Sequence, residues 1–142
     1  MPASSPTPSP DSPETWQSDY PQEAFDFVSD GLGHTVSLVH GAGPVDEEEG
    51  SHVDGRQLSE GLRDFAIRRF GLLAPTVLAQ WNIHRTDDFG RIVFAMIAMK
   101  RMNKTEDDRI EDFQGVFEFR TAFSDNAIAE AIGALRDEER GA

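Results

Sequence analysis

Residues 87–101 constrain the fold most, because this stretch is apolar almost all the way round a helix. The residues that share one face are Phe89, Ile92, Val93, Met96 and Met99. A helix without a polar face normally lies at the centre of a domain. Thr86 is the expected N-cap, and Lys100 and Arg101 close the end at which cations are favourable. We therefore expect 87–101 to be the centre of the core.

The best-marked neighbouring helix covers residues 55–70, where apolar residues recur at steps of three and four. Asp54 and Gln57 have the spacing of a capping box at its start. Gly71 follows its end, where a left-handed residue terminates helices at little cost. Both boundaries of this helix are thus predicted from local chemistry.

Other segments complete the expected architecture. Apolar stripes at helical spacing cover 25–39 and 73–81, and Ser124 is the expected N-cap of a last helix. The residues GVFEF alternate with a period of two, so a short strand or hairpin near 113–120 is an open alternative. The chain is expected to be mainly α-helical, a compact bundle of about five helices around the central apolar helix (87–101).

The N-terminus differs in composition from the rest of the chain. Residues 1–19 are rich in Ser, Pro and acids, and after Met1 their one large apolar side chain is Trp16. Such a segment buries too little surface to offset its ordering entropy, so we expect a disordered leader with a solvated Trp16. Docking of Trp16 on the domain or on a partner is the alternative. Residues 20–140 are expected to form a single helical domain, with a mobile Gly- and Glu-rich loop at 41–52.

The net charge of −13 is distributed unevenly along the chain. Residues 1–55 carry −11, residues 56–104 carry +5 and residues 105–142 carry −7. The total opposes binding to nucleic acid, whereas the basic centre could steer an acidic partner.

Composition also restricts the compartment and the chemistry. The chain has no cysteine, which excludes disulfides and thiolate metal sites and agrees with a reducing cytoplasm. We found neither a signal-peptide pattern nor the roughly 18 continuous apolar residues of a membrane span. We therefore expect a cytoplasmic protein that has no contact with membranes.

No motif indicates a catalytic, cofactor-binding or metal-binding residue. The segment HRTDDFG overlaps two kinase-like signatures in one helix start, and the chain is too short for a kinase. The acids of 106–112 lack the loop spacing that binds calcium and are better explained as a solvated helix start. The histidines lack the paired spacing of a zinc site; they are His34, His40, His52 and His84.

A set of basic side chains remains as a candidate partner-binding site: Arg63, Arg68, Arg69, Lys100, Arg101 and Lys104. The leading hypothesis is a non-enzymatic module that binds another protein through this basic centre and its acidic flanks. One alternative is a nucleic-acid or ribosome contact through a helix-turn-helix-like core formed by 55–70, 73–81 and 87–101. A second alternative is an enzyme whose site is not visible in the sequence. The ordinary explanation of these bases is pairing with the abundant acids.

Several blocks of the chain together resemble a known family. They are HVDGRQLSEGLRDFAIRRFG, TVLAQW, TDDFGRIVF and NKTEDDRIEDF with its aromatic tail, and they span roughly residues 20–123. They look like a family of small uncharacterised bacterial proteins found mainly in planctomycetes and verrucomicrobia. The resemblance implies a cytoplasmic protein and supplies no activity, cofactor or catalytic residue.

Overall fold

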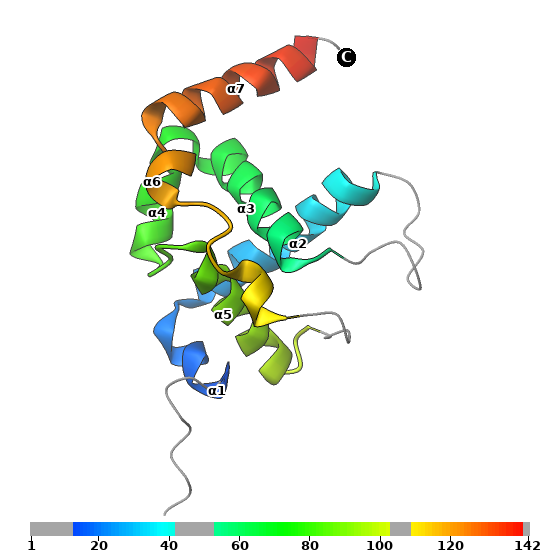
Figure 1. The fold of residues 1–142 in the computed structure, drawn as a ribbon, viewed down its shortest axis with the longest axis vertical. Coiled ribbons are helices and arrows are strands. Elements are labelled where there is room, and N and C mark those ends of the chain that lie inside the picture. Colours follow the sequence, from blue (N-terminus) through cyan, green and yellow to red (C-terminus); the bar gives the residue numbers. More distant parts are fainter. Residues whose placement is uncertain (1–12, 42–52, 103–108, 141–142) are drawn as a thin grey trace, which may run out of the picture.

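The computed structural model describes residues 13–41, 53–102 and 109–140, and these are mainly α-helical, as predicted (Figure 1). The helices, with 3-10 helices labelled η, are α1 Pro13–Trp16, η1 Gln17–Asp19, α2 Gln22–His40, α3 Gly55–Phe70, η2 Gly71–Leu73, α4 Ala74–Gln80, α5 Thr86–Ala98, η3 Ile110–Phe113, α6 Phe119–Ala122 and α7 Asp125–Arg140. In Figure 1, α1 and α7 lie at opposite ends of the molecule. Among the described residues, no helix has the length and apolar character needed to cross a membrane.

α5 is central, as its all-round apolar character predicts. Phe89 and Ile92 are completely buried and Met96 is 2% exposed. The predicted ends of this helix need correction. Thr86 is not the N-cap: Arg85 precedes the helix, and the buried Thr86 hydroxyl accepts a hydrogen bond from the Val116 N–H at 3.1 Å.

The helix also ends earlier than predicted, at Ala98. Lys100 lies beyond it with a φ of 60°, in the left-handed region that ends helices. Lys100 and Arg101 therefore belong to the turn after α5 and not to the helix itself.

The predicted helix caps of α3 and α7 are present. The Asp54 carboxylate accepts from the Gln57 N–H at 2.7 Å, and the Gln57 side chain accepts from the Asp54 N–H at 2.9 Å. Gly71 follows α3 with a φ of 58°. The Ser124 hydroxyl oxygen accepts from the Ala127 N–H at 3.1 Å at the start of α7. These interactions fix where the two helices begin.

α2 and α3 cross closely because two glycines leave room for their neighbours. A Cβ at Gly61 would overlap the Thr35 hydroxyl, and one at Gly31 would overlap the Leu62 side chain. The Thr35 hydroxyl is completely buried at this crossing and donates to the Gly31 carbonyl at 2.7 Å. Gly31 thus has a packing role where α2 and α3 cross.

The last part of the predicted leader, residues 13–19, forms α1 and η1. Trp16 is only 9% exposed and belongs to the core, so the docking alternative is the correct one. Its neighbour Tyr20 is 6% exposed, and α1 packs against α5. Burial of these two rings offsets the entropy that the Pro-rich composition suggests is too costly. Residues 1–12, and residues 42–52 of the loop predicted at 41–52, lie outside the described residues.

The strand or hairpin considered near 113–120 is absent, and no strand occurs in the described ranges. η3 ends at Phe113, and α6 begins at Phe119. Phe117 and Phe119 stack with ring centroids 5.8 Å apart, although they alternate in sequence. The backbone that connects η3 to Phe117 donates hydrogen bonds to side chains at the start of α5. The Gly115 N–H, for example, donates to Asp87 at 3.3 Å. These contacts replace a β ladder.

Candidate functional site

Two open hollows adjoin at Glu60 on the outer side of α3. The larger, of about 720 Å³, is the Arg63 hollow; its lining is Glu60, Arg63, Phe117, Glu118, Thr121, Ala122 and Ala127. The smaller, of about 470 Å³, is the Leu38 hollow; its lining is Thr35, Leu38, Val39, Gln57, Glu60, Gly61 and Asp64. We call the two together the α3 groove. It runs from the C-terminal end of α2 to α6 and the start of α7.

The Leu38 hollow has an exposed apolar rim. Leu38 is 51% exposed and Val39 is 39% exposed, near the end of α2. The Thr35 hydroxyl beside them already donates to a backbone carbonyl of its own helix. This hollow therefore offers apolar contact on one wall and the polar side chains of α3 on the other.

The Arg63 hollow contains a guanidinium held by the backbone. Arg63 Nε donates to the Ala122 carbonyl oxygen at 3.0 Å, which satisfies the last carbonyl of α6. A guanidinium has five N–H donors, so four remain on the two terminal nitrogens. Within the part of the chain that the structure describes, no side chain or carbonyl accepts from them.

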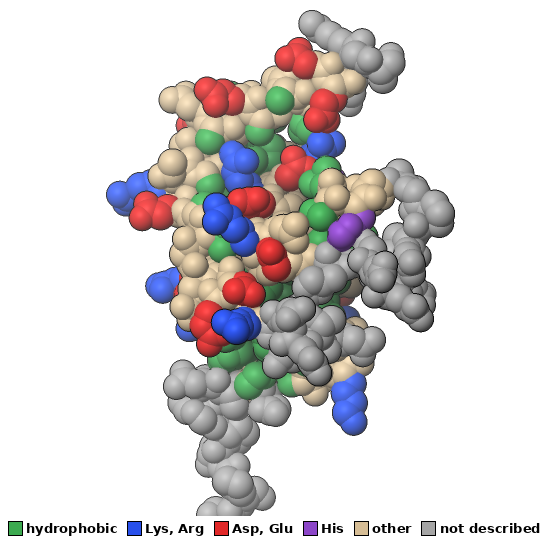
Figure 2. All heavy atoms as spheres, turned by 45° about the vertical axis from the view of Figure 1, so that its right-hand side comes forward, with side chains coloured by type: hydrophobic (Ala, Val, Ile, Leu, Met, Phe, Trp, Pro, Cys, Tyr) green, Lys and Arg blue, Asp and Glu red, His purple; other side chains and the backbone are tan. Residues whose placement is uncertain are grey.

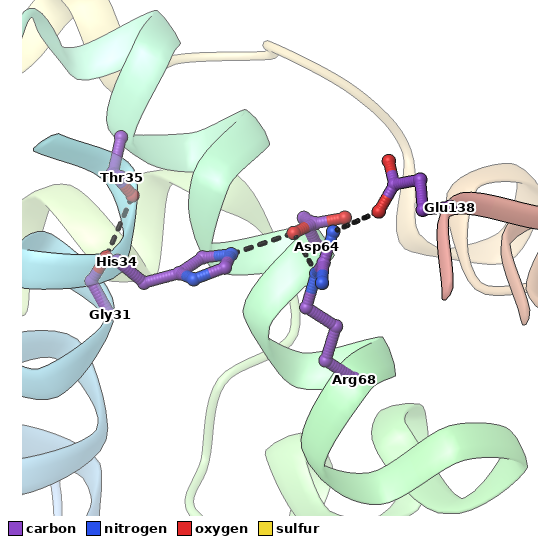
Figure 3. Close-up of polar contacts among 6 residues, drawn as sticks. All are labelled: Gly31, His34, Thr35, Asp64, Arg68 and Glu138. Atoms are coloured by element: carbon purple, nitrogen blue, oxygen red, sulfur yellow. Dashed lines mark hydrogen bonds and ion pairs between the residues drawn. The ribbon is translucent and has the colours of Figure 1, made fainter. Parts of the chain in front are cut away.

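Next to the groove, a chain of polar contacts joins α2, α3 and α7 (Figure 3). His34 Nε2 lies 2.7 Å from Asp64 Oδ2, and Arg68 Nε donates to the same oxygen at 2.6 Å. Arg68 Nη2 then donates to Glu138 at 3.3 Å. Burial lowers the pKa of Arg68, but the Asp64 and Glu138 carboxylates outweigh it, so this pKa is raised.

A histidine–aspartate pair also occurs in hydrolases, where the histidine activates a nucleophile. Here the adjoining Leu38 hollow is lined by no serine, and the chain has no cysteine. The Thr35 hydroxyl donates to Gly31 and not to His34. We therefore assign the His34–Asp64 contact to the attachment of α2 to α3.

A second polar cluster is buried at the start of α5. Asp88 is 6% exposed and accepts from the Tyr20 hydroxyl at 2.6 Å and from the His84 and Arg85 N–H groups at 2.8 and 3.2 Å. Arg91 Nη1 lies 3.7 Å from Asp88 Oδ1, the oxygen that also accepts from Tyr20. Burial, followed by the hydrogen bond to Asp88, raises the pKa of Tyr20. The bond from Tyr20 to Asp88 in this cluster holds the N-terminal segment on α5.

The structure describes five of the six predicted partner-binding bases and places them in different environments. Arg68 is paired with acids as described, Arg69 lies 3.6 Å from Asp30, and Arg101 lies 4.0 Å from Asp26. Figure 2 likewise shows acidic and basic side chains intermixed on the face that it presents. Lys100 is exposed in the turn after α5, and Lys104 lies outside the described residues. Of the six, Arg63 is the one found in the lining of a described hollow.

The histidines and acids of the described ranges meet in pairs and form no larger group. His84 Nε2 lies 3.1 Å from Asn82 Oδ1, and His34 contacts Asp64 alone among acids. No group of three His, Asp or Glu side chains in the described ranges is arranged to hold a metal ion. His52 and the acids at 106–108 are outside those ranges.

Comparison with protein-family models, with curated proteins and with solved structures gave no match to this chain. The resemblance to the planctomycete and verrucomicrobial family therefore stays a prediction. The function has to be argued from the geometry of the α3 groove.

Proposed function

We propose that this protein is a non-enzymatic, cytoplasmic protein-interaction module that binds a segment of another protein along the α3 groove. The observation that carries the proposal is the exposure of Leu38 and Val39 in the lining of a hollow. Large apolar side chains at the edge of a groove commonly mark sites of peptide or helix docking.

A comparison within the same chain supports this choice of surface. Only four large apolar side chains are exposed among the described residues: Leu38, Val39, Leu72 and Leu73. The second pair lies in η2 and lines neither part of the groove. The first pair is therefore the one that combines exposure with a concave surface.

The nucleic-acid alternative has less support. Its recognition helix would be α5, whose Phe89 and Ile92 are completely buried. Arg68, Arg69 and Arg101 face carboxylates that compete with phosphate for them. The alternative of an enzyme lacks a nucleophile beside His34, as described above.

The test is crosslinked affinity purification of the full-length protein from its own cells, with and without nuclease. The groove variant is the double substitution Leu38→Asp, Val39→Asp, and its matched control is Leu72→Asp, Leu73→Asp. Both add two charges at exposed apolar sites, so both are expected to fold, as thermal unfolding would verify. We expect wild type and the control to enrich the same protein and the groove variant to lose it.

Two outcomes would contradict the proposal. Equal enrichment by both double variants would mean that the groove is not the binding surface. Release of everything captured after nuclease treatment would favour the nucleic-acid alternative instead.

A further inference from the structure

We propose that the Arg63 hollow recognises the charges of the bound segment: Arg63 binds a carboxylate, Glu118 binds a cation, and the apolar part of the lining contacts an apolar side chain. The proposed ligand is thus a peptide segment in which an acidic and a basic residue flank an apolar one. This inference rests on the proposed function and defines the chemistry of its partner.

Arg63 is prepared for a carboxylate by the way in which it is held. The 3.0 Å bond from Nε to the Ala122 carbonyl fixes one edge of the guanidinium and leaves its terminal nitrogens for a ligand. Side-by-side N–H groups of arginine match the two oxygens of a carboxylate. Arg68 and Arg69 on the same helix already face Asp64 and Asp30, so Arg63 is the α3 arginine of the basic set without an acidic partner among the described residues.

The acids of the hollow require a cation on the same ligand. Glu118 is exposed, and its carboxylate has no partner among the described residues. Glu60 already faces Arg56 at 3.5 Å, although both side chains are well exposed. A purely acidic segment would be repelled by Glu118 and Glu60, and a purely basic one by Arg63. A segment that carries both signs is complementary to the whole lining.

Part of the lining of the Arg63 hollow is apolar. Phe117 stacks on Phe119 and meets Phe123 edge to face with ring centroids 6.2 Å apart. Ala122 and Ala127 complete this apolar part without filling the space in front of it. A volume of about 720 Å³ lies within the range of sites that hold small ligands or a few side chains.

The test uses the full-length protein and the capped peptide acetyl-Glu-Leu-Lys-amide, followed by proton–nitrogen correlation NMR. We expect saturable shifts at the Arg63 Nε–H and at the Thr121 and Ala122 amides. Two control peptides replace either Glu or Lys by Gln, and each should bind about tenfold more weakly, a loss of about 1.4 kcal/mol.

Variants of the protein test which of its side chains recognises each charged residue of the peptide. Arg63→Gln should bind the parent peptide about tenfold more weakly and should no longer distinguish Glu from Gln in the peptide. Glu118→Gln should no longer distinguish Lys from Gln. Arg120→Gln removes an exposed arginine that lines neither hollow, so it should bind like wild type.

Arg63 also donates to a helix carbonyl, so Arg63→Gln could weaken binding by disturbing the structure. A second variant distinguishes that effect from loss of the charge. Arg63→Lys keeps the charge but not the paired N–H groups, and it should weaken binding less than Arg63→Gln. Absence of saturable shifts, or equal affinity for all three peptides, would overturn the charge-recognition role. In that event, continued dependence of partner capture on Leu38 and Val39 would leave the proposed function standing, whereas loss of that dependence would remove both.

Discussion

The hydrogen bond between Tyr20 and Asp88 gives the most direct test of the N-terminal packing. Replacing Tyr20 by Phe keeps the ring but removes the buried 2.6 Å bond to a carboxylate. A hydrogen bond to a charged group contributes about 1.5–3 kcal/mol, so Tyr20→Phe should lower the free energy of unfolding by that amount near neutral pH. Chemical denaturation followed by circular dichroism measures this difference.

The same bond predicts a dependence on pH whose sign follows from the raised pKa of Tyr20. In the unfolded chain the phenol loses its proton near pH 10, whereas in the folded protein burial and Asp88 keep it protonated. The contribution is therefore complete below about pH 10 and decreases as the pH rises further. By about pH 11, ionisation of the unfolded state should remove about 1.4 kcal/mol of stability.

Tyr20 is the single tyrosine of the chain, so tyrosinate absorbance reports on it alone. Comparison with Tyr20→Phe at each pH cancels the titration of all other groups. The difference in unfolding free energy between the two proteins should narrow by about 1.4 kcal/mol between about pH 8 and pH 11. A constant difference, or tyrosinate formation near pH 10 in protein that is still folded, would refute the buried contact with Asp88.

Two further substitutions, each with a control substitution, test the packing of the helices. Gly61→Ala places a Cβ against the buried Thr35 hydroxyl and should destabilise the protein by about 1–3 kcal/mol. Its control Gly33→Ala has open space around the added Cβ and should stabilise the protein by up to about 1 kcal/mol. If thermal unfolding ranked the two variants the other way, the close crossing of α2 and α3 would be contradicted. Trp16→Ala removes a core ring and should lower the free energy of unfolding by about 3 kcal/mol or more. Its control Gln17→Ala, at the exposed neighbour, should change that free energy by less than about 0.5 kcal/mol. Similar small values for both variants would show that α1 does not dock on α5.

Helices whose signals are local could be predicted from the sequence. The boundaries of α3 follow from Asp54, Gln57 and Gly71, which act within a few residues of each other. α5 could be placed at the centre because its own side chains leave no polar face. In both cases the chain segment itself contains the physical cause of the structure.

Features that depend on distant partners could not be predicted. The burial of Trp16 requires the surface of α5, and composition near Trp16 points instead to disorder. The alternation at Phe117 and Phe119 suggested a strand, but aromatic stacking and bonds to the start of α5 determine that backbone. Neither cause can be inferred from the local periodicity of the sequence.

The candidate site shows the same division. Arg63 was predicted from the sequence, but only as one member of a basic set. Its contact with Ala122, 59 residues away, distinguishes it from the other members of that set. Val39 was counted in the apolar stripe of its helix, whereas it is 39% exposed at the groove. Phe117 and Glu118 gave no signal of a site, because the hollow exists only once α3 and α6 have packed together.

The docking of the N-terminal segment on α5 has a consequence for the order of events during synthesis. Residues 13–20 leave the ribosome before α5, because Asp88, which accepts from Tyr20, is 68 positions further along the chain. The nascent segment therefore cannot form this contact until α5 has been translated. Its docking on α5 must come late in cotranslational folding.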